Sequence, residues 1–420
     1  MEPSSHPQVN NGNNYCRYCS AKLTQSFIDL GYAPPSNAYL TIKKLSMPEA
    51  YYPLRVMVCN KCWLVQTEDF ACADDLFLDD YAYFSSTSSS WLNHAKNYCE
   101  NVTSRFNLKS NSMVIELASN DGYLLRNFIN SSIPCIGIEP TVETANVAKS
   151  LGITVIEEFF TEKLAITLYE DGKDADLIIG NNVYAHVPDI NDFTKGITKL
   201  LKKNGVVTLE FPHLLKLIKY SQFDTIYHEH FSYFSLTVVR KIFESNGLKI
   251  FDVEELSTHG GSLRVYGSRK DSKYETFRNV EKIINEEIEF GLNNCKVYEN
   301  FQSQADVIKN SVLSFLLESK RSKTSVAAYG AAAKGSTLLN YAGIKPDLLP
   351  VVYDAAPSKQ GKYMPGSHIP IKHPNELNKE PPNYLIILPW NLGSEISNQL
   401  LDIKNKGTKL ISFVPEICYW

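Results

Sequence analysis

The segment Tyr227-His-Glu-His230 places four ionisable or hydroxylated side chains in a row, which is costly to bury unless they serve a site. Histidine suits general-base work on a carbon acid, because its unperturbed pKa lies near neutrality and a carboxylate can orient it. An extended segment would separate the histidines from Glu229, whereas a turn would let Tyr227, Glu229 and His230 converge on a substrate. The alternatives are a metal site, although zinc-protease helices space their histidines four residues apart, and structural hydrogen bonding at a domain seam.

Four of the nine cysteines form two Cys-x-x-Cys pairs, Cys16 with Cys19 and Cys59 with Cys62. In a chain without a secretion signal, such pairs are more often metal sites than disulfides. Four thiolates at this spacing are the usual structural zinc arrangement, with a redox pair or unpaired core thiols as alternatives. A closed shell of four thiolates leaves no open coordination position, so we expect one structural zinc ion. The 39 residues between the pairs must fold back as a subdomain.

Carboxylates end the first strands expected in the central part of the chain. A dinucleotide site would need Gly-x-Gly-x-x-Gly after the first strand, so that backbone amides approach a pyrophosphate. The turn here has only Gly122, and it carries Glu116 and Asp121. Carboxylates would repel phosphate, but they suit a cationic ligand without phosphate, such as S-adenosylmethionine. Glu139, at the end of the second strand, is placed to accept both ribose hydroxyls of that ligand.

Residues after the third and fourth strands extend the same site. The segment Glu157-Glu-Phe-Phe160 can flank an adenine, and the end of the fourth strand faces the same crevice, because ligands bind at the carboxyl ends of parallel strands. The order of these motifs predicts a methyltransferase core, although Glu139 or Asp121 could instead be a helix N-cap or first-turn acid. The expected donor-binding residues are Glu116, Ala118, Asn120, Asp121, Gly122, Glu139, Pro140, Glu158, Phe159 and Asn181.

A loop of small residues, Gly330-Ala-Ala-Ala-Lys-Gly-Ser336, stands between an expected strand and an expected helix. Gly and Ala permit close backbone approach, the helix N-terminus favours an anion, and Lys334 supplies positive charge. The loop therefore indicates phosphate binding, with tight packing of a helix on a sheet as the alternative. Asp354 ends the next strand, and a polar loop with Lys359 and Lys362 follows it.

Alternating short apolar runs and amphipathic stretches predict a parallel sheet with helices on both faces from 112 to 213. Two further strands joined by Gly260-Gly261 have no helix between them, so they should form an antiparallel hairpin at the end of the sheet. Residues 272–322 indicate long helices, with one apolar stripe from Tyr298 to Phe315, and a second alternating unit follows. The expected strands are 113–117, 135–139, 153–156, 176–180, 206–211, 249–255, 262–268, 325–329, 349–354, 384–389 and 409–414.

Several motifs occur in an order that resembles one enzyme family. They are the paired Cys-x-x-Cys motifs, Asp80-Tyr-Ala-Tyr-Phe-Ser-Ser86, Glu116-Leu-Ala-Ser-Asn-Asp-Gly122, Tyr227-His-Glu-His230 and Gly330-Ala-Ala-Ala-Lys-Gly-Ser336. Over residues 15–415 the chain resembles the sugar-nucleotide C-methyltransferases that make branched deoxysugars, including enzymes for tetronitrose-type and virenose-type sugars. Members of this family typically transfer a methyl group from S-adenosylmethionine to carbon 3 of a TDP-linked 4-keto-6-deoxyhexose, leaving S-adenosylhomocysteine.

The resemblance implies an α/β chain with a zinc-binding module, a central class I methyltransferase sheet of Rossmann type and a second Rossmann-like domain. The expected divisions are a disordered lead-in (1–14), the zinc-binding domain (15–78), the S-adenosylmethionine-dependent methyltransferase domain (79–270), connecting helices (271–322) and a Rossmann-like sugar-nucleotide-binding domain (323–420).

Roles for individual residues also follow from the resemblance. His230 is the implied base that forms an enolate, and Tyr81 or Tyr227 can donate to the developing oxyanion. Tyr81 and Tyr83 could exchange roles. The residues expected around the reacting carbon are His230, Glu229, Tyr227, Tyr81 and His186. Those expected along the pyrophosphate and nucleotide are Tyr83, Ser85, Ser86, Lys334, Asp354, Lys359 and Lys362.

Composition narrows the class of partners. The chain has 42 Lys and Arg against 46 Asp and Glu among 420 residues, and this near balance excludes a broad grip on nucleic acid or anionic lipid. No apolar run approaches about 18 residues, and the N-terminal residues lack a signal-peptide pattern. We therefore expect a cytoplasmic monomer that binds a sugar nucleotide, without a membrane or nucleic-acid partner. A methyltransferase acting on oxygen or nitrogen, and a zinc-knuckle adaptor that only binds nucleotides, are the alternatives.

Overall fold

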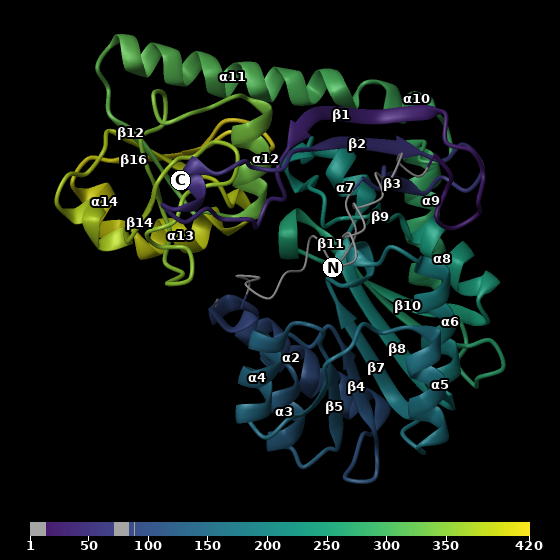
Figure 1. Ribbon diagram of the computed structural model, residues 1–420. Helices are drawn as coiled ribbons and strands as arrows, with labels where there is room; N and C mark the ends of the chain where they lie inside the picture. Colours follow the sequence, from purple (N-terminus) through teal and green to yellow (C-terminus); the bar gives the residue numbers. More distant parts are fainter. Residues whose placement is uncertain (1–13, 71–83, 88) are drawn as a thin grey trace, which may run out of the picture.

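A seven-stranded sheet forms the centre of the computed structural model, which describes residues 14–70, 84–87 and 89–420 (Figure 1). Its strand order is β10-β11-β8-β7-β4-β5-β6, and only β11 runs antiparallel to its neighbours. The strands are β4 (Val114–Leu117), β5 (Cys135–Ile138), β6 (Thr154–Ile156), β7 (Ala175–Asn181), β8 (Leu201–Pro212), β10 (Leu248–Leu256) and β11 (Ser262–Arg269). All lie on predicted runs, and the predicted hairpin forms one edge of the sheet. Of the lead-in expected at 1–14, only Asn14 is among the described residues.

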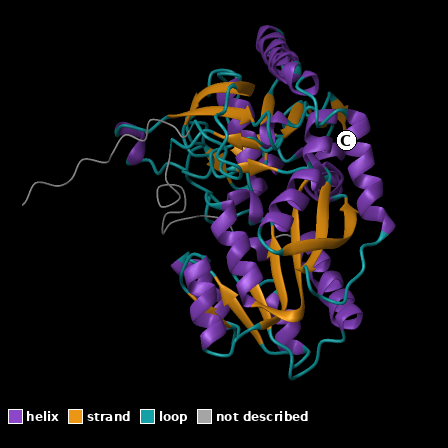
Figure 2. Ribbon diagram, turned by 90° about the vertical axis from the view of Figure 1, so that its right-hand side faces the viewer, coloured by secondary structure: helices purple, strands orange, loops and turns teal. Residues whose placement is uncertain are grey.

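Helices cover both faces of this sheet, as the alternating pattern predicted (Figure 2). In α6, Ile190, Phe193 and Ile197 are buried at spacings of three and four residues, and the Asp189 carboxylate accepts from the first free amides of the helix. The helices are α2 (Ser89–Phe106), α3 (Leu125–Asn130), α4 (Val142–Ser150), α5 (Glu162–Glu170), α6 (Ile190–Leu200), α7 (Leu214–Lys219) and α8 (Leu236–Ser245). Side chains of α2, α3 and α4 pack on one face, and those of α5, α6 and α8 pack on the other.

The residues between the two cysteine pairs, expected to fold back as a subdomain, form the first two strands of an antiparallel sheet that later segments complete. β1 (Gln25–Ala33), β2 (Tyr52–Val58) and β3 (Val65–Thr67) are joined by β9 (Ser232–Tyr233), which begins two residues after His230. The pairing of β3 with β9 therefore fastens the N-terminal module to the segment that carries the histidines.

A long helix connects the N-terminal module to the C-terminal unit. Residues 272–322 contain α9 (Arg278–Phe290), α10 (Lys296–Glu299) and α11 (Phe301–Arg321). The predicted apolar stripe is buried from Tyr298 to Val312, and Phe315 is partly buried. Figure 1 shows α11 running from β1 to the C-terminal unit, so the stripe packs against both.

The second alternating unit is a six-stranded sheet of order β14-β13-β12-β15-β16-β17, parallel except for β17. Its strands are β12 (Val326–Tyr329), β13 (Val352–Tyr353), β14 (Ile371–Lys372), β15 (Tyr384–Ile387), β16 (Lys409–Ser412) and β17 (Cys418–Tyr419). Its helices are α12 (Ala333–Tyr341), α13 (Gly393–Gln399) and α14 (Leu401–Asn405). The four predicted strands are confirmed, whereas the short strands β14 and β17 were not expected. Single turns of 3-10 helix are η1 (Lys44–Ser46), η2 (Ser85–Thr87), η3 (Tyr184–His186), η4 (Phe223–Thr225), η5 (Thr258–Gly260), η6 (Pro374–Asn378) and η7 (Trp390–Leu392).

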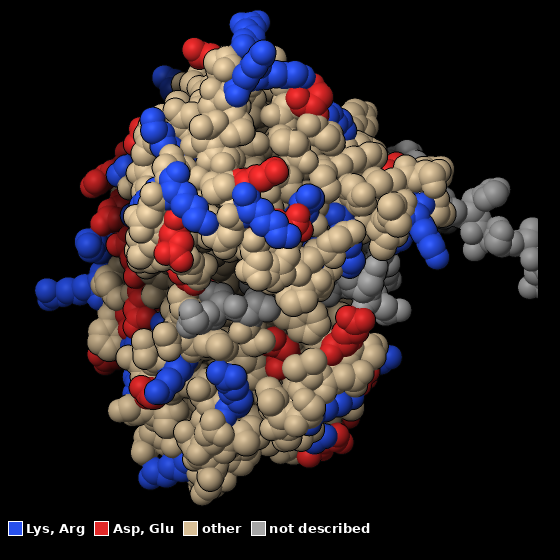
Figure 3. All heavy atoms as spheres, turned by 90° about the vertical axis from the view of Figure 1, so that its left-hand side faces the viewer, with Lys and Arg blue, Asp and Glu red and all other residues tan. Residues whose placement is uncertain are grey.

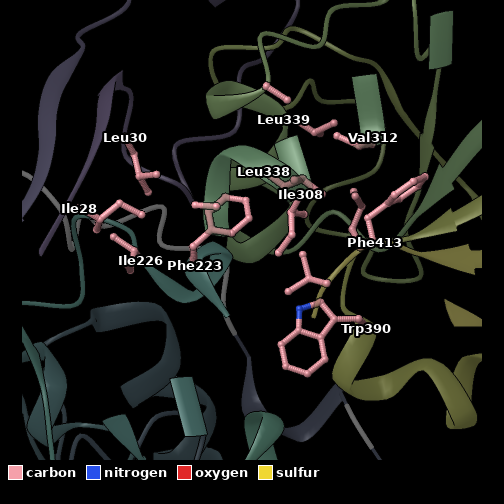
Figure 4. Packing of buried hydrophobic residues seen from close by; sticks show 14 of the residues in the cluster. Ile28, Leu30, Phe223, Ile226, Ile308, Val312, Leu338, Leu339, Trp390 and Phe413 are labelled. Carbon is pink, nitrogen blue, oxygen red and sulfur yellow. The ribbon is translucent and has the colours of Figure 1, made fainter. Parts of the chain in front are cut away.

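One hydrophobic cluster joins the N-terminal module, the segment at 214–226 that follows β8, the helix α11 and the C-terminal unit. Figure 4 shows side chains that converge from β1, from η4, from α11, from α12 and from the end of β16. Because this core is continuous, the segments that border it are held in fixed relation to one another. The residues labelled there are Ile28, Leu30, Phe223, Ile226, Ile308, Val312, Leu338, Leu339, Trp390 and Phe413.

The outer surface fits the balanced composition. On the face drawn in Figure 3, Lys and Arg side chains are interspersed with Asp and Glu side chains, so neither sign of charge dominates there. Among the described residues, the helices are too short or too polar to span a bilayer.

Candidate active site

The four paired cysteines converge at the start of the chain. The ligand atoms of Cys16, Cys19, Cys59 and Cys62 all lie within 4.8 Å of one another. The Sγ atoms of Cys16 and Cys62 are 3.5 Å apart, and those of Cys19 and Cys59 are 3.6 Å apart. Tetrahedral zinc with bonds of about 2.3 Å separates its sulfur ligands by about 3.8 Å, so the four thiolates fit a zinc ion.

Both cysteine pairs use the same local turn. The amide of Ser20 donates to the Cys16 carbonyl at 2.8 Å, and that of Trp63 donates to the Cys59 carbonyl at 2.9 Å. Ser20 and Trp63, each directly after the second cysteine of its pair, adopt positive φ angles of 58° and 73°. These two matching turns bring the four thiolates together, as the spacing predicted.

A cavity of about 510 Å³ lies where the carboxyl ends of the central strands, the turn at 225–230 and the C-terminal unit meet. It unites residues from all three predicted sets: Ser85, Ala118, Asn120, Glu139, Pro140, Glu158, Phe159, Asn181, His186, Tyr227, His230, Lys334 and Lys359. Other predicted residues do not line it, namely Ser86, Glu116, Asp121, Gly122, Glu229, Asp354 and Lys362. Tyr81 and Tyr83 lie outside the described residues.

At the donor end of the cavity, a strained turn follows β4. Ala118, Asn120 and Gly122 all have positive φ angles, of 55°, 50° and 77°. A Cβ on Gly122 would lie 2.4 Å from Ile153, so this glycine is required by packing against the next crossover. The Glu139 carboxylate fixes the turn, because it accepts from the amides of Asn120 and Thr141, both at 2.9 Å.

The segment at 85–86 docks on this donor turn. The Ser85 amide donates to Asn120 Oδ1 at 2.9 Å, and the Ser86 amide donates to Asp121 Oδ2 at 3.1 Å. The sequence placed Ser85 and Ser86 near the nucleotide of the sugar substrate. The structure instead brings their backbone to the turn expected to bind the methyl donor.

Buried carboxylates make the donor end electrostatically negative. Glu116 is 1% exposed, and burial, together with Asp121 and Glu139, raises the pKa of Glu116 well above its usual range. Within the described part of the chain, Glu116 Oε2 and Asp121 Oδ1 have no hydrogen-bond partner. A cationic ligand at this end would relieve the repulsion, and a diphosphate would increase it. The donor end therefore fits S-adenosylmethionine, whose sulfonium carries a positive charge.

The backbone turns at the Tyr-His-Glu-His segment, since the His230 amide donates to the Tyr227 carbonyl at 3.0 Å. The rings of Tyr227 and His230 have centroids 4.0 Å apart, and the His186 ring lies 4.8 Å from that of His230. All three line the cavity. The predicted convergence of Tyr227 and His230 therefore occurs, and His186 joins them.

The protonation state of His230 follows from its partner. His230 Nδ1 lies 2.8 Å from the carbonyl oxygen of Thr225. A carbonyl can only accept, so Nδ1 carries the hydrogen and Nε2 keeps its lone pair. Burial, reinforced by His186, lowers the pKa of His230 well below its usual range. The imidazole is therefore neutral at physiological pH, in the form that a general base requires.

The other two residues of the turn point elsewhere. The Glu229 carboxylate is fully buried and accepts from the Ser36 hydroxyl at 3.0 Å and from Asn37 Nδ2 at 3.1 Å. The sequence expected Glu229 beside the base, but the structure uses this side chain to fasten the turn to the N-terminal module. His228 Nε2 lies 3.3 Å from the Tyr52 carbonyl of β2, so His228 also anchors the turn.

Sequence reasoning missed His259, which lines the same cavity. His259 has a φ of 53°, and its Nε2 lies 3.3 Å from Asn182 Nδ2. The Trp91 ring, 5.5 Å from that of His259, also lines the cavity. The double glycine at 260–261 was interpreted only as a hairpin turn. The signal that could have identified His259 is its position directly before this turn, just after a strand whose carboxyl end lies at the edge of the sheet where ligands bind.

Where the C-terminal unit borders the cavity, Lys334 and Lys359 line it, whereas Asp354 and Lys362 do not. Lys334 is 9% exposed, and burial lowers its pKa to about 8. Lys359 Nζ donates to the Ala331 carbonyl at 2.8 Å. Asp354 accepts from the amides of Ala331 and Ala356, at 2.6 and 2.7 Å, so it holds the loop that precedes α12. Lys362 lies outside the cavity lining.

Comparisons with known proteins agree with this arrangement. Three family models match consecutive parts of the chain: a zinc binding domain at 16–77, a methyltransferase domain at 91–253 and a C-methyltransferase C-terminal domain at 257–415. The C-methyltransferase NovU of Streptomyces niveus is 31% identical over 401 residues, which cover 96% of this chain and 95% of NovU.

Two solved structures are similar to the central part. Magnesium protoporphyrin IX methyltransferase from Synechocystis PCC 6803 aligns with a TM-score of 0.35 and 16% identity, over 43% of this chain and 83% of that one. An S-adenosylmethionine-dependent methyltransferase from Anabaena variabilis aligns with a TM-score of 0.35 and 14% identity, over 42% of this chain and 86% of that one. The family of this chain is decided by its identity to NovU over nearly the full length and by the three family models. The chain belongs to the family of S-adenosylmethionine-dependent C-methyltransferases that its motifs predicted, with S-adenosylmethionine as methyl donor and a cysteine cluster for zinc.

Proposed function

We propose that this C-methyltransferase transfers the methyl group of S-adenosylmethionine to carbon 3 of a TDP-linked 4-keto-6-deoxy sugar. The observation that carries the proposal is the neutral His230 imidazole, whose Nδ1–H donates to the Thr225 carbonyl. His230 lines the cavity together with carboxylates (Glu139 and Glu158) and lysines (Lys334 and Lys359). A base without charge is the form needed to remove a proton from carbon. The family resemblance of the motifs supports the sugar nucleotide as the substrate.

The chemistry that this geometry supports begins with an acidic carbon. A ketone at carbon 4 acidifies the proton on carbon 3, because the resulting enolate spreads its charge onto oxygen. His230 Nε2 takes that proton, and the pair of electrons from the carbon–hydrogen bond forms the double bond of the enolate. S-adenosylmethionine supplies the electrophilic methyl group that carbon 3 then takes up. The protein holds the two substrates in reacting geometry, which contributes several kcal/mol to lowering the barrier.

The C-terminal unit supports the sugar-nucleotide part of the proposal. The N-terminus of α12 faces the cavity through Ala332 and Ala333, and its Ala332 N-cap offers no side chain to satisfy the first amides. A helix N-terminus of this kind attracts phosphate, and Lys359 adds a positive charge nearby. We therefore assign the pyrophosphate to Lys359 and the start of α12. The cytoplasmic location, the monomeric state and the domain boundaries stay predictions.

Product analysis tests this function. The enzyme, S-adenosylmethionine and a TDP-linked 4-keto-6-deoxyhexose are incubated, and the product is examined by mass spectrometry and by NMR. We expect a mass increase of one methylene and a new methyl group on carbon 3. A methyl group on oxygen or nitrogen would favour the alternative methyltransferase, and the lack of any methylated product with TDP-linked 4-keto sugars would contradict the proposed substrate class.

A further inference from the structure

Lys334 ends in the interior of the molecule, away from the rim of the cavity. Its Nζ donates to Asn391 Oδ1 at 3.0 Å and lies 4.3 Å from the centre of the Trp390 ring. Trp390 Nε1 in turn donates to Asp224 Oδ2 at 2.7 Å. Among the described residues, Lys334 makes no direct ion pair. The Asp224 carboxylate favours the charged form of Lys334 without contacting it directly. Because a buried ammonium without a direct carboxylate contact is costly, an anion in the cavity would stabilise Lys334 further.

The helix that carries Lys334 is fixed to the turn that carries the base. The Thr337 hydroxyl of α12 donates to the Ile226 carbonyl at 2.7 Å, one residue before Tyr227. The Ser336 hydroxyl donates to the Ser36 carbonyl at 3.0 Å, and the Ser36 hydroxyl donates to Glu229 of the same turn. Lys334 and His230 are therefore held at a set separation by hydrogen bonds as well as by the shared core.

Lys334 lines the same cavity as His230 and His259. The Lys334 ammonium contributes to the lowered pKa of both His230 and His259. Lys359 is in a different situation, because its Nζ bonds to the Ala331 carbonyl and lies 3.8 Å from Asp354. Lys359 therefore has a carboxylate within 4 Å, whereas the Asp224 carboxylate favours the charged form of Lys334 without a direct ion pair to it. An anion near the base can therefore approach the Lys334 ammonium.

We propose that the Lys334 ammonium, rather than a tyrosine hydroxyl or a phosphate contact, stabilises the enolate oxygen at carbon 4. This inference rests on the proposed function. When His230 takes the proton, the electrons of the carbon 3–hydrogen bond form the carbon 3–carbon 4 double bond, and the carbonyl electron pair moves onto oxygen. Lys334 keeps its own protons throughout and donates one hydrogen bond to that oxygen. Its contribution is electrostatic and grows as the negative charge develops.

The two lysines give a matched pair of variants. Lys334→Met and Lys359→Met each remove one cation from the same cavity, and the two assays separate chemistry from binding. The first assay follows exchange of the carbon 3 proton with deuterium by NMR, with S-adenosylhomocysteine bound so that no methyl transfer occurs. The second measures the affinity for TDP alone by calorimetry, and S-adenosylmethionine binding serves as the test that each variant is folded.

We expect Lys334→Met to slow exchange by about 10²–10³-fold, the usual loss for an oxyanion donor, with nearly unchanged TDP affinity. Lys359→Met should show the reverse, with a weaker TDP affinity as its main defect. Wild-type exchange in Lys334→Met, or a loss of TDP affinity as its main defect, would overturn the inference. If that variant does not fold, the wild-type profile decides: kcat/KM for exchange should fall as pH rises through about 8, where free Lys334 loses its charge.

The same assays separate the two claims. If the wild type neither exchanges the proton nor methylates any TDP-linked 4-keto sugar, the proposed function fails. If the wild type exchanges the proton and Lys334→Met does so equally fast, only the role of Lys334 fails.

Discussion

The two ends of the cavity differ in their electrostatics. At the donor end, Glu116, Asp121 and Glu139 cluster, and burial raises the pKa of Glu116. At the acceptor end, His230 lies close to His186 and shares the cavity with Lys334, and burial lowers the pKa of each of these three groups. The donor end therefore suits a cationic ligand, and the acceptor end suits a group on which negative charge develops.

This difference explains why one chain can hold both partners of the reaction. A sulfonium is attracted to the carboxylates, while an enolate oxygen and a diphosphate are attracted to the lysines and to the start of α12. The two ends also differ in their support. The donor turn is held by its own strand ends and by the segment at 85–86, whereas the acceptor turn is fastened to the zinc module through Ser36 and β9.

The largest expected effect comes from His230, the proposed base. His230→Asn should lower the turnover number for methyl transfer by about 10²–10⁴-fold, because general-base catalysis is lost. Binding of S-adenosylmethionine at the other end should be unchanged. His228→Asn is the matched control, since His228 lies in the same turn but faces the Tyr52 carbonyl outside the cavity lining. Equal losses in the two variants would show that the turn, and not the imidazole of His230, is what matters.

Removing zinc should damage the acceptor end more than the donor end. Cys59→Ser should lower the free energy of unfolding by more than about 4 kcal/mol, the scale of a lost structural metal. Because Thr67 of β3 bonds to the backbone at His230 and Phe231, the turnover should fall before S-adenosylmethionine binding does. Cys418→Ser, outside the cluster, is the control. Elemental analysis that finds no zinc in fully active protein would refute the structural role of the metal.

A donor-end substitution should leave the acceptor end intact. Glu139→Ala should weaken S-adenosylmethionine binding by about 1–3 kcal/mol, because it removes charge-assisted hydrogen bonds and loosens the turn at Asn120. Titration calorimetry with TDP should give the same affinity as in the wild type. An unchanged dissociation constant for S-adenosylmethionine would mean that the ribose is bound elsewhere.

The smallest expected effect is that of mildly acidic pH on the rate of the wild-type enzyme. A histidine with its ordinary pKa of about 6.5 would be half protonated at pH 6.5, and the rate would be about halved. Burial lowers the pKa of His230 in the folded enzyme, so Nε2 stays unprotonated and kcat/KM should not be lower at pH 6.5 than at pH 7.5. The loss should begin only at more acidic pH. A midpoint at pH 6.5 would indicate an exposed imidazole.

The sequence predicted the parts of this molecule that depend on local pattern. Apolar runs located the strands of both large sheets except the short β14 and β17, and cysteine spacing located the zinc site, because each of these signals is contained in a few neighbouring residues. The Tyr-His-Glu-His segment was recognised as a site for the same reason. Carboxylates after the first two strands pointed to the donor end, since strand ends of a parallel sheet meet at one edge.

What could not be predicted depends on contacts between distant segments. The direction of Glu229 is set by Ser36 and Asn37, which lie almost two hundred residues earlier in the chain. The two-residue strand β9 has too little pattern to be recognised, and it exists because β3 offers an edge. His259 resembled an ordinary turn residue, and only its place over the cavity reveals it as a candidate for substrate contact.

The most direct test of the account is the fate of the carbon 3 proton in His230→Asn. The enzyme is incubated in deuterium oxide with a TDP-linked 4-keto-6-deoxyhexose and S-adenosylhomocysteine, and the carbon 3 signal is followed by NMR. The wild type should exchange this proton without methyl transfer, and His230→Asn, with normal affinity for both ligands, should lose nearly all exchange. Exchange in His230→Asn at the wild-type rate would contradict the account, because another group would then be the base.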